Sequence, residues 1–102
     1  MADDMIDTAG TLVNGAQALV NCGAKAIYTC ATHAVLSGPA IERLKKAPIK
    51  EVLVTDTIPV PPEMMLDKIK VLTVAPMLGE AIRRIYKNVS ISEMFGFYWS
   101  GT

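Results

Sequence analysis

The segment KAIYTCATHAVLSGPAIERLKKAPIKEVLVTDT, residues 25–57, predicts a strand, a helix and a second strand in succession. Its first part, Lys25–Thr32, is short, apolar and rich in β-branched residues, which is typical of a strand buried on both faces. Its last part, Glu51–Thr57, has the same character. Because a helix joins the two strands, we expect them to pair in parallel.

The helix between these strands is marked by residues that start and stop helices. Ser37 stands in the N-cap region, Pro39 lies near the first turn, and Pro48 follows the end. Three more prolines, at positions 59, 61 and 62, end the second strand.

The same alternation continues on both sides of this segment. Thr11–Cys22 has apolar residues at helical spacing, and Gly23 follows it as a typical C-terminal glycine. Ile69–Ala75 predicts a third strand, and residues 76–88 predict a helix with an apolar stripe. That stripe consists of Met77, Leu78, Ala81, Ile82 and Ile85. We therefore expect an α/β fold over residues 1–102, with a mainly parallel sheet and helices on both faces.

Composition narrows the class of protein. Ten basic and ten acidic residues cancel, so no net positive field attracts nucleic acid or an anionic membrane. Apolar runs are far shorter than a membrane span, and the acidic start MADDMID is unlike a secretory signal. Cys22 and Cys30 have no partners at metal-ligand spacing, so we expect buried, reduced thiols and a cytoplasmic location.

The segment DDMIDTAGT, residues 3–11, combines two acids with a loop of small residues before a helix. N–H groups at a helix N-terminus bind phosphate without Lys or Arg, and Gly10 allows close approach of the backbone. A helix capped by Asp7 or Thr8 is the simpler alternative. The acids accept hydrogen bonds from sugar hydroxyls, so the whole segment suits ribose 5-phosphate. Solvated terminal charges remain the alternative for Asp3 and Asp4.

A loop of this kind lies at the carboxyl end of a strand in α/β folds. Only Met1 and Ala2 precede the acids here. We therefore expect a partial domain, truncated at its first strand.

DDMIDTAGTL resembles the phosphoribosyl pyrophosphate binding signature of type I phosphoribosyltransferase folds. GAKAIYTCATHAVLSGPAIERL, EVLVTDTIP, APMLGEAIRRI and SISEMF resemble, in order, the C-terminal portion of the ribose-phosphate pyrophosphokinase family. The resemblance runs from Asp3 to about Phe95. It implies transfer of pyrophosphate from ATP to C1 of ribose 5-phosphate, with Mg²⁺, in an oligomeric enzyme of nucleotide biosynthesis.

The resemblance also implies roles for single residues. Asp3 and Asp4 would bind the ribose hydroxyls. The 5-phosphate would lie in the loop formed by Asp7, Thr8, Ala9, Gly10 and Thr11. A regulatory site for phosphate or ADP would be lined in part by Ser90, Ser92 and Phe95. Catalytic residues, metal ligands and the ATP site belong to parts of the family's longer chain that are absent here, so we expect the chain alone to be inactive.

Two other functions stay open at this point. One is a non-catalytic regulatory subunit associated with the synthetase, although such proteins lose the small-residue loop. The other is a type I phosphoribosyltransferase, which would need a base-binding hood. We expect His33 to be a hydrogen-bonded structural residue, and we expect Arg83 and Arg84 to lie on a solvated helix face. We expect the methionines at positions 64, 65 and 77 to fill space in the core or in an interface.

Overall fold

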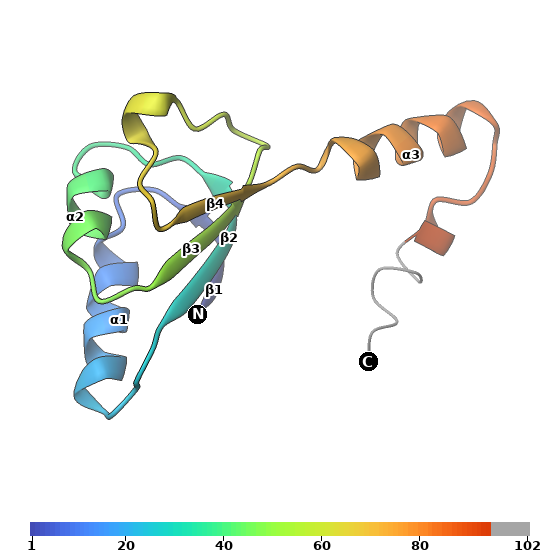
Figure 1. The fold of residues 1–102 in the computed structure, drawn as a ribbon. Helices are drawn as coiled ribbons and strands as arrows, with labels where there is room; N and C mark the ends of the chain where they lie inside the picture. Colours follow the sequence, from blue (N-terminus) through green and yellow to red (C-terminus); the bar gives the residue numbers. More distant parts are fainter. Residues whose placement is uncertain (95–102) are drawn as a thin grey trace.

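The computed structural model describes residues 1–94 of the chain. Eight segments follow one another, and Figure 1 shows their arrangement. They are β1 (Ala2–Ile6), α1 (Gly10–Asn21), β2 (Tyr28–Ala34), α2 (Ala40–Lys46), β3 (Glu51–Thr55), a 3₁₀ turn (Pro62–Met64), β4 (Ile69–Leu72) and α3 (Ala75–Tyr86). The predicted strands and helices all form, and their ends shift by one to a few residues.

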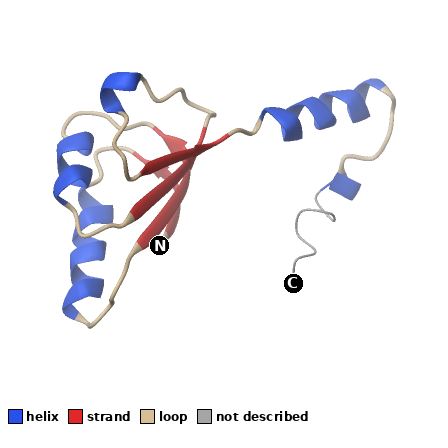
Figure 2. Ribbon diagram, viewed as in Figure 1, coloured by secondary structure: helices blue, strands red, loops and turns tan. Residues whose placement is uncertain are grey.

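The four strands form one parallel sheet in the order β1-β2-β3-β4. Parallel crossovers share one handedness, so strands laid down in chain order place their connections on the same face. Figure 2 shows α1 and α2 together on one side of the sheet. The expectation of helices on both faces is therefore wrong for the described residues.

The sheet also contains a first strand that the sequence analysis expected to be missing. β1 begins at Ala2 and includes both acids, Asp3 and Asp4. It pairs with β2 from Ala2 opposite Cys30 to Ile6 opposite Ala34. The loop that follows Ile6 is thus presented by a hydrogen-bonded strand. Apolar patterning could not reveal this strand, because four of its five residues are exposed.

The core lies between the sheet and the two helices. Side chains of β2 and β3 alternate, with Thr29, Ala31, Val52 and Val54 facing the helices and buried. Leu44 of α2 packs among them and is fully buried. The strands β2 and β3 were expected to be buried on both faces, but they are buried on one face only. The prediction of buried cysteines is also wrong. Cys22 and Cys30 are both free, as expected, but both are exposed.

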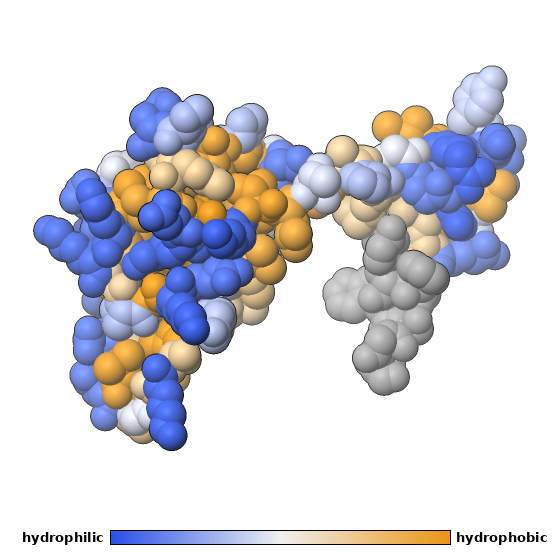
Figure 3. All heavy atoms as spheres, in the orientation of Figure 1, coloured by the Kyte–Doolittle hydropathy of each residue, from blue (hydrophilic) through white to orange (hydrophobic). Residues whose placement is uncertain are grey.

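α3 extends away from the sheet beyond β4 (Figure 1), and none of its residues is buried. Its apolar stripe is open, with Ile82 67% and Ile85 62% exposed. Figure 3 shows apolar surface on this projecting part. The radius of gyration is 16.3 Å, against about 13 Å for a compact domain of this length. The helix forms as predicted, and within residues 1–94 its stripe has no core to join.

The C-terminal end of α2 is held by a lysine that directly precedes β4. The Lys68 ammonium donates to the carbonyls of Leu44 at 2.7 Å and Ala47 at 3.2 Å. We predict that Lys68→Met lowers the free energy of unfolding by about 1 kcal/mol, because these carbonyls lose their charged donor. Urea unfolding followed by circular dichroism measures the change. Lys70→Met, which removes an exposed charge from β4 itself, is the matched control. Equal effects of the two substitutions would contradict this role for Lys68.

Candidate functional site

The loop after β1 forms one wall of a pocket of about 170 Å³. In parallel sheets the carboxyl ends of the strands meet at one edge, where ligands bind. Six of the seven residues expected to contact ribose 5-phosphate line this pocket. They are Asp3, Asp7, Thr8, Ala9, Gly10 and Thr11. Met5, Ile6 and Leu12 complete the lining.

Asp4 is the expected residue that the pocket does not include. Successive side chains of a strand point to opposite faces, and both acids lie in β1. The backbone N–H of Asp4 donates to Asp3 Oδ1 at 2.7 Å, which orients the Asp3 carboxylate. The strand thus places only one member of the acidic pair in the lining of the loop pocket.

The N-terminus of α1 is open for a ligand. Ala9 precedes the helix in a left-handed conformation, φ 66° and ψ 8°, and makes no side-chain cap. The first bond of the helix runs from the N–H of Val13 to the carbonyl of Ala9. The N–H groups of the first turn therefore lack acceptors within the helix, and no acidic residue lies in that turn. Such N–H groups bind anions.

Asp7 does not act as the cap that the simpler alternative required. Its carboxylate accepts a hydrogen bond from the Ser37 hydroxyl, and its carbonyl accepts the Ser37 N–H at 3.0 Å. Arg43 of α2 adds a third bond, from Nη1 to the carbonyl of Thr8 at 3.1 Å. Sequence analysis missed Ser37 and Arg43 as partners of the loop. Ser37 is not the N-cap of α2 either, since Pro39 holds that position.

Hydrogen bonds also stiffen the carboxyl ends of β2 and β3. His33 Nδ1 lies 2.7 Å from Thr57 Oγ1, which confirms the prediction of a hydrogen-bonded histidine. The hydroxyl of Thr73 and the N–H of Val74 hold the pKa of the Asp56 carboxyl below its ordinary value. Val74 N–H donates to Asp56 Oδ1 at 2.8 Å, which ties the end of β3 to the residue before α3.

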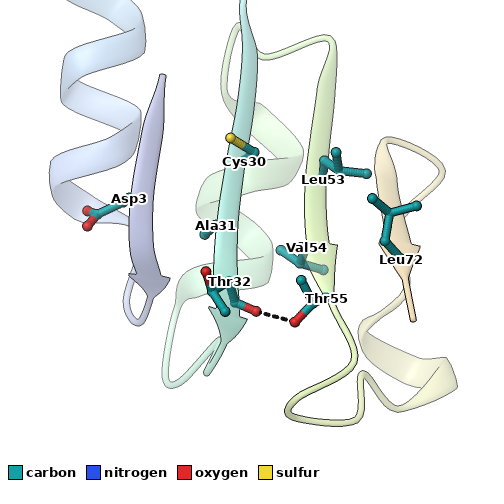
Figure 4. Close-up of a pocket in the computed structure, with 8 residues that line it drawn as sticks. All are labelled: Asp3, Cys30, Ala31, Thr32, Leu53, Val54, Thr55 and Leu72. Carbon is teal, nitrogen blue, oxygen red and sulfur yellow. Dashed lines mark hydrogen bonds between the residues drawn. The ribbon is translucent and has the colours of Figure 1, made fainter. Parts of the chain in front are cut away.

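A second pocket, of about 200 Å³, lies on the sheet (Figure 4). Cys30, Leu53 and Leu72 come from three neighbouring strands, and the Thr55 hydroxyl donates to the Thr32 carbonyl at 2.7 Å. Asp3 also borders this pocket, but Figure 4 shows its carboxylate pointing away from the other labelled residues. The apolar lining makes this pocket unsuited to a sugar phosphate.

Two of the expected regulatory residues, Ser90 and Ser92, follow α3 in the chain, and α3 projects away from the sheet that carries the loop pocket (Figure 1). Ser90 Oγ and Ser92 Oγ are 2.7 Å apart, and Arg84 donates to the Ser90 carbonyl at 2.8 Å. Phe95 lies outside the described residues. Both arginines expected on a solvated face also pair with Glu80, Arg83 at 2.5 Å and Arg84 at 2.8 Å.

Within residues 1–94, no three His, Cys, Asp or Glu side chains lie close enough to share a metal ion. No helix in this range has the length and apolarity needed to span a bilayer. Of the three methionines expected to fill the core or an interface, Met64 packs against the core, whereas Met65 and Met77 are exposed.

Comparison with known proteins gives consistent matches. The model of the family described as phosphoribosyl synthetase-associated domain matches residues 1–96. Proteins named ribose-phosphate pyrophosphokinase from Caldanaerobacter subterraneus and Clostridium acetobutylicum are 63% and 58% identical over 95 residues. These residues are 93% of this chain and 30% of each relative, so the chain spans less than a third of their length.

A crystal structure of phosphoribosylpyrophosphate synthetase from Mycobacterium smegmatis has the same fold, with a TM-score of 0.83 and 41% identity. The likeness covers 85% of this chain and 29% of that one. The family match occupies the N-terminal 96 residues of this chain. It does not bear out the expected C-terminal placement within the longer proteins.

The Glu80 cluster predicts a pH dependence for α3. Hydrogen bonds from Arg83, then from Arg84, lower the pKa of Glu80 to about 2. Since the pKa is lowered on folding, the stabilising effect is complete above the ordinary value of 4.5 and is lost as the pH falls towards 2. We expect a carboxyl ¹³C titration of Glu80 to have its midpoint near 2, and the midpoint to rise in Arg83→Gln. Lys87→Gln is the control, and an equal rise there would refute the assignment to Arg83.

Proposed function

We propose, because this chain belongs to the phosphoribosyl synthetase-associated domain family, that it supplies the ribose 5-phosphate site of a ribose-phosphate pyrophosphokinase. One observation carries this proposal. The loop of residues 7–11 and the Asp3 carboxylate line the same pocket, at the carboxyl end of β1. Hydrogen-bond donors and acceptors thus meet in one place, which suits a ligand that is both a phosphate and a sugar.

The loop is the phosphate half of the proposed site. The 5-phosphate accepts hydrogen bonds from N–H groups of the first turn of α1, which no side chain caps. The positive end of the helix dipole adds to this attraction. Gly10 has no positive φ, and a Cβ on it would stand 3.0 Å from Arg43 Nη1, so the space that the missing side chain leaves is the space beside that guanidinium.

Asp3 is the ribose half of the proposed site. A carboxylate accepts hydrogen bonds from the ribose hydroxyls, which lie at the end of the ligand away from the 5-phosphate. Asp4 stays a candidate for the same role through the other face of β1. Asp7, in the loop itself, would repel a phosphate, but its carboxylate is occupied by the Ser37 hydroxyl. The hydrogen bond to Ser37 supports the proposal that a phosphate can bind to this loop although the loop contains an aspartate.

The proposed reaction follows from the names of the relatives and from the resemblance. The C1 hydroxyl of ribose 5-phosphate attacks the β-phosphorus of ATP, the bond to the α-phosphate oxygen breaks, and AMP leaves as the hydroxyl loses its proton. In this scheme the residues of this chain bind and orient the acceptor. Mg²⁺ would neutralise phosphate charge, and its ligands, the ATP site and the catalytic groups are assigned to the remainder of the longer protein.

A non-catalytic subunit associated with the synthetase is the second candidate, and the description of the family favours keeping it. The intact loop with its uncapped helix argues for the catalytic lineage, because a purely regulatory subunit has no need of it. A type I phosphoribosyltransferase is less well supported, since the relatives bear the other name. Oligomer formation, regulation by phosphate or ADP near Ser90 and Ser92, and a cytoplasmic location stay predictions.

The loop is tested in a chimera. Residues 1–95 of this chain replace the matching 95 residues of the Caldanaerobacter enzyme. We predict that Gly10→Val raises KM for ribose 5-phosphate about tenfold or more and leaves KM for ATP nearly unchanged. The reason is that a side chain at residue 10 pushes against Arg43, which holds the Thr8 carbonyl, and so displaces the loop that would bind the phosphate. Steady-state kinetics with each substrate varied in turn measures both constants.

Gly79→Val is the matched control, because a Cβ at Gly79 meets nothing within 4 Å. If Gly10→Val leaves both KM values at those of the control, the loop does not bind the phosphate. If the unaltered chimera folds without any activity, the non-catalytic alternative gains support.

The 102-residue chain is predicted to be inactive alone. Pyrophosphoryl transfer needs charge neutralisation and in-line placement of two substrates, and the groups for both are assigned elsewhere. We expect no AMP from ATP, ribose 5-phosphate and Mg²⁺, and only weak binding of ribose 5-phosphate. The chimera serves as positive control in the same AMP assay. Turnover proportional to chain concentration and abolished by Gly10→Val would show that the chain carries its own catalytic groups.

A further inference from the structure

We infer that Arg43 is a positioning residue for the phosphate loop, an inference that rests on the proposed function. Arg43 Nη1 donates to the Thr8 carbonyl at 3.1 Å. The same nitrogen lies 3.0 Å from the point where a Cβ on Gly10 would stand. Arg43 is not among the residues that line the loop pocket.

The conformation of the loop explains why such a contact is needed. Ala9 has a φ of 66°, which costs a residue with a Cβ about 1 kcal/mol or more. A strained residue keeps its conformation only where its neighbours hold it. Ser37 binds Asp7 and Arg43 binds Thr8, so the two residues before Ala9 are both fixed from the β2–α2 side. Ala9 itself is 4% exposed, which leaves it little room to relax.

Arg43 also acts on the loop electrostatically. The Thr8 carbonyl and the Ala9 N–H belong to one peptide unit, and a cation bound to the oxygen polarises the N–H into a stronger donor. Among residues 1–94, no other Lys or Arg side chain donates a hydrogen bond to residues 7–11. Residues 7–11 contain no cationic side chain, so the bond from Arg43 brings a positive charge to the Thr8–Ala9 peptide.

This role differs from simple packing in what it affects. A structural contact would alter the stability of the whole domain and would treat charged and neutral ligands alike. A positioning role predicts local loosening of residues 8–10 and selective loss of affinity for phosphate. Lys45, on the same helix, is exposed and donates no bond to the loop, so it provides a matched charge.

The experiment uses the ¹⁵N-labelled 102-residue chain, followed by NMR. Inorganic phosphate, ribose 5-phosphate and neutral ribose are titrated separately into the wild type, Arg43→Met, Arg43→Lys and Lys45→Met. We expect Arg43→Met to raise Kd for phosphate about three- to tenfold and to leave Kd for ribose unchanged. Arg43→Lys should fall between Arg43→Met and the wild type, because it keeps the charge without the planar fork. Lys45→Met should match the wild type.

Amide hydrogen exchange without ligand is the second measurement. Arg43→Met should speed exchange of the Val13 and Ser37 amides, which donate to the loop carbonyls of Ala9 and Asp7, and leave the amides of β3 unchanged. Equal exchange and equal phosphate affinity in Arg43→Met and Lys45→Met would overturn the inference, as would faster exchange throughout the domain. If the wild type binds neither phosphate nor ribose 5-phosphate while exchange still changes at the loop, the proposed binding site fails and the contact of Arg43 with the loop stands.

Discussion

The parallel pairing of β1 with β2 is the constraint on which the candidate site depends. The ladder begins where the Met1 ammonium donates to the Tyr28 carbonyl at 2.8 Å. It ends where the N–H groups of Val35 and Leu36 both bind the carbonyl of Ile6, at 3.0 and 2.9 Å. The chain therefore leaves the sheet at a defined point, and the loop of residues 7–9 starts beside the segment that follows β2.

That adjacency determines the chemistry of the loop. Asp7 meets Ser37, and Thr8 meets Arg43, across about thirty residues of sequence. The contacts give the Asp7 carboxylate a hydroxyl partner and bring a cation to the Thr8 carbonyl. They also hold Ala9 in a conformation that a lone peptide would leave. The open N-terminus of α1 is thus usable for an anion because its neighbours are occupied elsewhere.

The chain order of the strands has a second consequence. With every crossover on one face, the opposite face of the sheet is left with apolar side chains such as Leu53 and Leu72, and α3 carries its stripe outward. A domain of this kind buries only one layer of core. The relatives are more than three times as long as the matched segment.

The sequence by itself determined the fold class, the order of helices and strands, and the position of the small-residue loop before α1. These features depend on local patterns, namely apolar strands, helical spacing and small residues before a helix. Each pattern can be recognised in a short window of sequence. The strand that carries Asp3 and Asp4 was missed because its exposed residues lack an apolar pattern, and its hydrogen bonds come from β2. The separation of Asp3 from Asp4, the exposure of Cys30, and the contacts of Ser37 and Arg43 were decided only by the tertiary structure. Each depends on which face or segment lies opposite, and that is set by pairing between residues far apart in the chain.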